Sequence, residues 1–322
     1  MSWVVYELLY KTTGPVRIGY HKLGFIQRTR YYIPGRTMWG AATALLTRAL
    51  HGGATEPGHY QDVGQKLMNK EIFLSYFYPC FLREESSERI IFFPRWIMGD
   101  PEWFSAEPSR LAYGSLTESE FEARFIASFG QTAIEPSLFA AEEASLHETE
   151  FICDKIRCDS SVQQLYFIGY LFVTGEMPKF DNRDIGWEKG DYRLKEILST
   201  IYVGGDRTYG AGRLRLKQDE SGPLRPQGLL FDQYEFDPHS GRIKVPERSP
   251  ILAHVPCSSE ELKGDFEPIV SLEYCEKKGP GQKPTVVSGL HWTPGSLTTK
   301  KKSFSIGAYG IWEEYKEERS HG

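Results

Sequence analysis

Short apolar runs rich in β-branched and aromatic residues recur along the chain and predict β-strands. They span residues 3–10, 147–156, 164–174 and 213–217. Two other segments, residues 36–51 and residues 191–201, repeat apolar residues at helical spacing and are predicted to be helices. The predicted order is strand, helix, strand, strand, helix, strand, and the second and third strands are expected to pair.

This order is that of a ferredoxin-like or RRM-like unit, in which an antiparallel sheet is backed by two helices, so we predict an α+β fold. The unit is expected to span residues 1–218, with a large insertion at about 52–145 where the pattern is irregular. After residue 218 the composition changes to proline, glycine and charge with short apolar runs. Residues 219–322 are therefore predicted to form a β-rich C-terminal lobe.

The composition is that of a folded protein. Of the 322 residues, 40% are hydrophobic and 25% are charged, which excludes general disorder. The N-terminus has no basic region followed by an apolar core, and no apolar run is long enough to span a bilayer. Five cysteines, an odd number, fit a reducing compartment better than a disulfide framework. We expect a cytoplasmic protein without a membrane partner.

Charge is distributed unevenly along the chain. The formal net charge is −5, yet no acidic residue occurs between Glu7 and Glu56. The cations in this interval are Lys11, Arg17, Lys22, Arg28, Arg30, Arg36 and Arg48. A basic segment in an acidic protein favours a polyanion bound to one face, because neutralising phosphates releases their counterions. The alternative is a solvated basic surface that binds nothing.

Residues 204–213 read Gly-Gly-Asp-Arg-Thr-Tyr-Gly-Ala-Gly-Arg and lie between the second predicted helix and the last predicted strand. Glycine permits a positive φ, so successive backbone N–H groups can form an anion-binding nest. Arg207 and Arg213 add charge and Tyr209 adds a stacking face, a combination that suits RNA. A nucleotide-binding loop would instead follow a strand or carry Gly-Lys-Ser/Thr. A tight turn that binds nothing is the second alternative.

Three landmarks in sequence order resemble the RAMP superfamily of CRISPR-associated proteins. The first is Tyr-Ile-Pro-Gly-Arg-Thr-Met-Trp-Gly-Ala at residues 32–41, shortly after Gly-Pro-Val-Arg-Ile-Gly at residues 14–19. The second is Thr-Ala-Ile-Glu-Pro at residues 132–136, and the third is the glycine-rich segment 204–213. The resemblance covers residues 3–217 and does not extend to the rest of the chain.

The resemblance implies an RRM-like fold and a subunit of a type III CRISPR effector complex. Backbone subunits that cleave target RNA carry an aspartate between the first strand and the Ile-Pro-Gly motif, whereas residues 19–30 contain no acid here. This departure favours a non-catalytic subunit, most like the five-type (Csx-ten-like) group, which caps the complex and holds the 5′ tag of the guide RNA. The implied partners are guide RNA, the large subunit and the backbone RAMP subunits, and no cofactor or metal is implied.

The expected RNA-binding residues come from the basic N-terminal segment and from the glycine-rich segment. They are Arg17, His21, Lys22, Arg28, Arg30, Arg36, Thr37, Trp39, Gly204, Gly205, Arg207, Tyr209, Gly210 and Arg213. Their cationic and aromatic side chains would contact phosphates and bases, and their glycines would let the RNA backbone approach closely.

His21 supports the main enzymatic alternative, a metal-independent RNA-processing endoribonuclease. Processing endonucleases of the RAMP family use a histidine near the N-terminus as general base toward a ribose 2′-hydroxyl. Lys22 or Tyr20 could supply the second group. Those enzymes usually lack the Ile-Pro-Gly motif, so contact of His21 with phosphate or base is the preferred interpretation. A backbone RAMP subunit of the same complex is the other alternative.

Other groups of residues have plain structural explanations. Cys153 and Cys158 fit buried thiols better than a zinc site, because no second close pair is present. Trp96 and Trp103 fit a core better than a base-stacking platform. The acidic run at residues 142–150 fits a solvated surface better than contact with a basic partner subunit.

Overall fold

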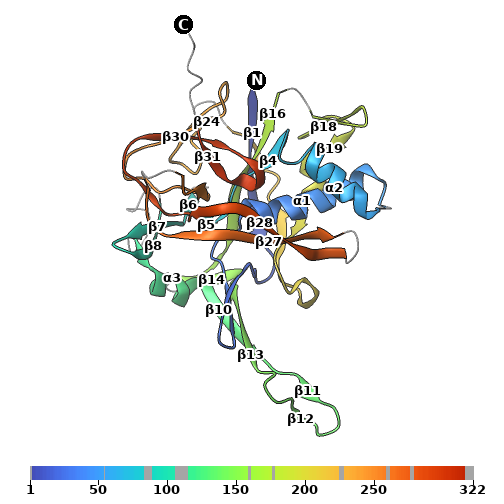
Figure 1. The fold of residues 1–322 in the computed structure, drawn as a ribbon, viewed down its shortest axis with the longest axis vertical. Coiled ribbons are helices and arrows are strands. Elements are labelled where there is room, and N and C mark those ends of the chain that lie inside the picture. Colours follow the sequence, from blue (N-terminus) through green and yellow to red (C-terminus); the bar gives the residue numbers. More distant parts are fainter. Residues whose placement is uncertain are drawn as a thin grey trace.

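The fold is mixed α+β and rich in strands (Figure 1). It is given by a computed structural model that describes residues 2–53, 55–82, 89–105, 115–158, 161–175, 178–224, 228–258, 262–275 and 279–315. Among these residues, no helix has both the length and the apolar character needed to cross a membrane.

The largest sheet is antiparallel and runs in the order β20-β21-β1-β16-β5-β6, with β22 paired to β1 and β4 paired to β16. Its strands are β1 (Trp3–Thr12), β4 (Ile72–Leu74), β5 (Tyr78–Leu82), β6 (Arg89–Ile91), β16 (Tyr166–Thr174), β20 (Thr200–Tyr202), β21 (Arg213–Leu216) and β22 (Gly222–Pro223). The two longest of them, β1 and β16, are the most apolar and lie at the centre, as their composition predicts.

Both faces of this sheet are covered. On one face, the Tyr10 hydroxyl donates to the carbonyl of Leu198 at 2.9 Å, next to α4 (Leu194–Ile197). Helix α1 (Gly35–Leu50) packs against α4, β4 and β20, and α2 (Pro57–Lys66) packs against α1. On the other face, the Phe231 N–H donates to the Tyr170 hydroxyl at 2.7 Å. Residues beyond 218 therefore complete the core of the N-terminal sheet.

A second sheet, β10-β13-β3-β2, lies at one end of the molecule and continues into a projecting ladder (Figure 1). Its strands are β2 (Gly19–Leu23), β3 (Ile26–Thr29), β10 (Ile126–Gln131) and β13 (His147–Ile152), and the ladder ends in β11 (Ile134–Glu135) and β12 (Ala140–Ala141). Next to it, β7 (Phe93–Ile97), β8 (Asp100–Phe104) and β9 (Leu116–Thr117) pack against α3 (Glu118–Phe125). Trp103 belongs to this core, because its ring stacks on Phe121 with centroids 4.1 Å apart.

The rest of the chain adds short strands and one long hairpin, β27–β28. They are β14 (Lys155–Cys158), β15 (Ser161–Gln164), β17 (Lys179–Phe180), β18 (Arg183–Gly186), β19 (Tyr192–Arg193), β23 (Glu235–Asp237), β24 (Arg242–Val245), β25 (Val255–Pro256), β26 (Leu262–Lys263), β27 (Phe266–Cys275), β28 (Gly279–Trp292), β29 (Leu297–Thr298), β30 (Lys302–Ile306) and β31 (Trp312–Glu314). The C-terminal region is thus β-rich, and its buried side chains join the same apolar cluster as those of the N-terminal sheet. The boundary at residue 218 stays a prediction.

Two predicted features differ from the structure. Within residues 191–201 only α4 is helical, as a single turn, because β19 precedes it and Ile201 joins β20, where it is fully buried in the sheet. The runs at 147–156 and 164–174 pair only at their ends, where Lys155 lies opposite Gln164, since β13 pairs with β10 and β3 while β16 pairs with β1. The intervening hairpin of β14 and β15 carries the chain from one sheet to the other.

Candidate nucleic-acid interface

The glycine-rich segment 204–213 is a hairpin loop between the antiparallel strands β20 and β21, and not a connection from a helix to a strand as predicted. It is docked on the segment that follows β1. The Gly205 N–H donates to the Arg17 carbonyl at 3.0 Å, and the Gly212 N–H donates to the Pro15 carbonyl at 2.7 Å. The third landmark of the sequence therefore packs against the segment 14–19 that precedes the first landmark.

Close packing within the chain requires two of the loop glycines. Gly204 has φ 72°, and a Cβ there would lie 1.8 Å from the Arg17 carbonyl oxygen. Gly212 has φ 75°, and a Cβ there would lie 1.9 Å from the Val203 carbonyl oxygen. Gly210 also has a positive φ, 88°, but a Cβ there would meet no atom within 4 Å. At Gly210, glycine is therefore needed for the backbone conformation of the turn and not for close packing.

Five of the ten residues of the loop have a backbone N–H that already donates within the protein. The N–H groups that donate to carbonyls of the protein are those of Gly205, Tyr209, Gly210, Ala211 and Gly212. The predicted anion nest of successive N–H groups is therefore wrong at these positions. The side chains are open instead: Arg207 is exposed and Tyr209 is 80% exposed. A ligand of this loop would be bound by side chains.

Beside the loop, the edge of the large sheet carries a row of cations. Arg215 on β21 lies directly opposite Lys11 on β1, and Arg213 lies opposite Tyr202 on β20. Alternate residues of a strand share a face, so these side chains lie on one side of the sheet. We define the loop–strand face as Lys11, Tyr202, Arg207, Tyr209, Arg213 and Arg215. Among the described residues, no carboxylate contacts its three arginines.

Most of the N-terminal cations are neutralised by acids from distant parts of the chain. The ion pairs are Arg17 with Asp206, Arg28 with Glu122 and Glu150, Arg30 with Glu267, and Arg36 with Glu273. A stretch of sequence without acids is therefore not a surface without acids. Of the remaining predicted residues in this segment, His21 and Lys22 are exposed on β2.

The start of α1 is covered by residues near the C-terminus. Arg36 is only 9% exposed, and its guanidinium lies 4.3 Å from the centre of the Tyr309 ring. Trp39 makes an edge contact with the same ring at 5.0 Å, and a Cβ on Gly35 would lie 2.5 Å from the Tyr309 carbonyl oxygen. The predicted contacts of RNA with Arg36, Thr37 and Trp39 would require this cover to move.

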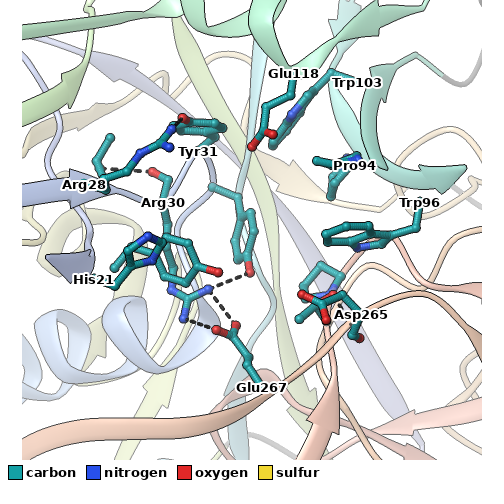
Figure 2. Close-up of a pocket in the computed structure, with 16 residues that line it drawn as sticks. His21, Arg28, Arg30, Tyr31, Pro94, Trp96, Trp103, Glu118, Asp265 and Glu267 are labelled. Atoms are coloured by element: carbon teal, nitrogen blue, oxygen red, sulfur yellow. Dashed lines mark hydrogen bonds and ion pairs between the residues drawn. The ribbon is translucent and has the colours of Figure 1, made fainter. Parts of the chain in front are cut away.

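A pocket of about 240 Å³ lies between β2–β3, β7–β8 and β27–β28 (Figure 2). It brings together three predicted RNA-binding residues, His21, Arg28 and Arg30, with Trp96. The Arg30 guanidinium lies 4.3 Å from the centre of the Tyr20 ring. Aromatic and cationic groups thus share the pocket with carboxylates, one of which, Glu267, pairs with Arg30.

Arg30 is held by a buried polar network. Its two terminal nitrogens donate to the two carboxylate oxygens of Glu267 at 2.7 and 2.9 Å. His254 lies 2.7 Å from Glu267 through Nε2 and 2.7 Å from the Tyr76 hydroxyl through Nδ1. Burial lowers the pKa of His254, so the neutral imidazole donates to Glu267 and accepts from Tyr76. Burial alone would raise the pKa of Glu267, but hydrogen bonds from His254 and Arg30 lower it to about 2.

The ring of His21 contacts the ring of Tyr20, one of the two residues predicted as a possible second group, with centroids 4.1 Å apart. Among the described residues, no hydrogen bond orients the imidazole. Anywhere in the part of the chain that the structure describes, no three residues of the types His, Cys, Asp and Glu lie close enough to hold a metal ion.

The comparisons with known proteins found similarity to solved structures alone; no family model and no curated protein matches. A chain of a type III-B Cmr-beta complex bound to cognate target RNA and AMPPnP aligns with a TM-score of 0.47 and 10% identity, over 91% of this chain and 85% of that chain. A second structure of Cmr-beta bound to cognate target RNA gives a TM-score of 0.44 and 10% identity, over 91% and 86%. Oligomeric Cmr4 from Pyrococcus furiosus gives 0.30 and 13% identity, over 69% and 99%. Because these TM-scores are below 0.5 and the identities are 10–13%, any functional conclusion must rest on the residues of this chain and not on these similarities.

Lys11, Tyr202 and Arg215 were not among the predicted site residues, although a signal for Arg215 was present. The alternation Arg213-Leu214-Arg215 on a predicted strand places both arginines on one face. Tyr202 could not be found in this way, because it directly follows the segment 191–201, which was predicted to be a helix and not a strand. Its position opposite Arg213 depends on the pairing of β20 with β21.

Proposed function

We propose that this chain is a non-catalytic structural subunit of a type III CRISPR interference complex that binds guide RNA near its 5′ tag. The loop–strand face carries the proposal. Four cations and two tyrosines lie there on a rigid sheet edge and its docked loop, and cations with exposed aromatic rings are the groups that bind single-stranded RNA.

The resemblance of the loop and of the Ile-Pro-Gly motif to the RAMP superfamily supplies the complex, the partners and the 5′ tag. In this proposal, β1, β16, β20 and β21 with α1 and α4 represent the RRM-like unit, and the remaining segments are elaborations of it. The large subunit and the backbone RAMP subunits are the proposed neighbours. The absence of an acid between residues 19 and 30 supports a subunit that holds RNA without cleaving it.

Charge removal at the loop–strand face is expected to weaken RNA binding. Arg207→Ala combined with Arg215→Ala should raise the Kd for a labelled single-stranded RNA carrying the repeat-derived tag by about tenfold in 0.1 M salt. If each arginine contacts one phosphate, the slope of log K against log salt should become shallower by about 1.4. Fluorescence anisotropy across a salt series measures both quantities.

A matched variant separates this effect from a change in net charge. Lys179→Ala combined with Arg248→Ala removes two cations that are 65% and 87% exposed and lie outside the loop–strand face. This control should retain the affinity and the slope of the unmodified chain. Equal behaviour of the two double variants would remove the loop–strand face from the RNA-binding surface.

The endoribonuclease alternative has its own test. With repeat RNA in EDTA, we expect no cleavage by the unmodified chain, because no hydrogen-bonded partner positions His21 among the described residues. His21→Ala should change RNA affinity only slightly. RNA cleavage by the unmodified chain that disappears in His21→Ala would establish the enzyme and overturn the scaffold.

A further inference from the structure

The β27–β28 hairpin lies beside the start of α1, where Glu273 of β27 pairs with Arg36 (Figure 1). A register shift divides the hairpin into a base and a distal part. We define the strap as residues 270–273 together with residues 283–286, the paired strands of the distal part. The strap therefore covers an arginine that the sequence predicts to bind RNA.

The strap has its apolar side chains on the solvent side. Val270, Leu272 and Val286 are 59%, 65% and 58% exposed. Alternate residues of a strand share a face, so Ser271 and Glu273 lie on the other side, toward the body of the protein. No described residue of the strap belongs to the buried apolar core. Burial of apolar surface therefore contributes little to holding the strap in place.

The polar contacts beneath the strap are incomplete. Ser271 and Thr285 lie directly opposite each other, and among the described residues neither buried hydroxyl has a hydrogen-bond partner. The same is true of Nη1 of Arg36. In this part of the chain, every hydrogen bond between the strap and residues outside the hairpin goes to Glu273, from Arg36 and from the Tyr309 hydroxyl at 3.3 Å. Buried polar groups without partners are destabilising, so one carboxylate holds the strap over an unsatisfied surface.

The hairpin has a place to bend between the strap and the base. Within the register shift, Gly289 has φ 82°, and a Cβ there would meet no atom within 4 Å. The base is fixed on both strands, because Arg30 donates twice to Glu267 and Trp292 pairs with Val255 of β25. Rotation at the shift would lift the strap and leave the contacts of the base intact.

Lifting the strap would expose a phosphate-binding group. Arg36 is only 9% exposed while the strap is closed. Its unpartnered Nη1 and the Nη2 that Glu273 would release form the guanidinium fork that matches a phosphate. The first turn of α1 contains no acidic residue, so the helix adds positive potential at this point. A phosphate of RNA could thus replace the carboxylate of Glu273.

We propose that the strap is an autoinhibitory cover, in which Glu273 occupies the phosphate site of Arg36 until bound RNA displaces it and lifts the strap. The inference rests on the proposed function, because the displacing ligand is the single-stranded RNA of that proposal. The exchange breaks the contacts of Glu273 with Arg36 and Tyr309 and forms an ion pair between Arg36 and an RNA phosphate. Arg36 therefore contributes to affinity only in the open state.

Glu273→Gln tests the competition, because it keeps the size of the side chain and removes its charge. We expect the Kd for the labelled tag RNA to fall about fivefold in 0.1 M salt, since the phosphate no longer competes with a carboxylate. In a chain that already carries Arg36→Ala, the same substitution should change the Kd less than about twofold, because the phosphate site is gone. Fluorescence anisotropy measures both effects.

Spin-label distances report the movement itself and need neither substitution. Leu272 on the strap and Lys66 on α2, which are 65% and 64% exposed, are each replaced by p-acetylphenylalanine and spin-labelled. Without RNA we expect one distance between the labels, and saturating RNA should add a longer one. Glu273→Gln should populate the longer distance without RNA.

Glu196→Gln is the control, because it removes an exposed carboxylate outside the hairpin and should change neither the Kd nor the distance. An unchanged Kd in Glu273→Gln, or a single unchanged distance with RNA bound, would overturn the proposal. If the Arg207 and Arg215 double variant bound RNA more weakly while the strap stayed closed, the strap alone would be wrong. If the unmodified chain bound no RNA, this proposal and the proposed function would both be wrong.

Discussion

Gly204→Ala is expected to lower the free energy of unfolding by about 4 kcal/mol, the sum of backbone strain and overpacking. A left-handed backbone costs a non-glycine residue about 1–2 kcal/mol, and the new Cβ would lie 1.8 Å from the Arg17 carbonyl oxygen. The loop must then move away from the segment after β1, which breaks the 3.0 Å hydrogen bond from Gly205 to Arg17. Urea denaturation measures the loss, and RNA affinity should fall with it because the loop–strand face loses its support.

Gly210→Ala is the matched control. Gly210 has a similar backbone, with φ 88°, but a Cβ there meets no atom within 4 Å. Only the backbone term remains, so the expected loss is about 1–2 kcal/mol. If the two variants lost equal stability, packing of the loop against Arg17 would not be what requires glycine at residue 204.

Local sequence patterns were sufficient to predict the elements that keep the same packing partners along their length. The apolar runs of β1 and β16 and the helical spacing of α1 predict those elements, because each packs against the large sheet or its cover along its length. The secondary structure of residues 191–201 was harder to predict. Its apolar spacing fits a helix, but pairing of Thr200 and Tyr202 with β21 draws the end of the segment into the sheet.

The charges of the candidate site could not be read from neighbouring residues. Arg30 and Arg36 are paired with Glu267 and Glu273, and in each pair the partners are 237 residues apart. The two arginines and the two glutamates have the same spacing of six residues, which in β27 places both glutamates on one face. Only the fold shows that β27 passes the N-terminal segment, so the sequence predicted a free basic patch where the structure has ion pairs.

The loop–strand face could be predicted from the sequence in part. Its arginines at 213 and 215 are separated by one residue, which local reasoning can place on one face of a strand. Their lack of carboxylate partners among the described residues is a property of the fold. Together with Lys11 directly opposite Arg215, they leave like charges side by side, an arrangement that a bound polyanion would stabilise.

Glu267→Gln is expected to lower the free energy of unfolding by at least about 3 kcal/mol at pH 7. The substitution keeps the size of the side chain but leaves the cation of Arg30 without its bidentate partner (Figure 2). Removing one member of a buried ion pair typically costs about 3–5 kcal/mol. Glu196→Gln provides the control, because its pair with Arg193 is more than half exposed and should contribute less than about 1 kcal/mol.

The pH dependence of this loss identifies the charge of Glu267 as its cause. The pKa of Glu267 in the folded protein is about 2, below its ordinary 4.5. A depressed carboxyl pKa contributes stability that is present above the ordinary value and is lost as the pH falls toward the folded value. The difference between the unmodified chain and Glu267→Gln should therefore be full at pH 6–7 and shrink between about pH 4.5 and pH 2. Urea titrations at several pH values measure it, and a difference that stayed constant down to pH 2.5 would show that packing, and not the ion pair with Arg30, accounts for the loss.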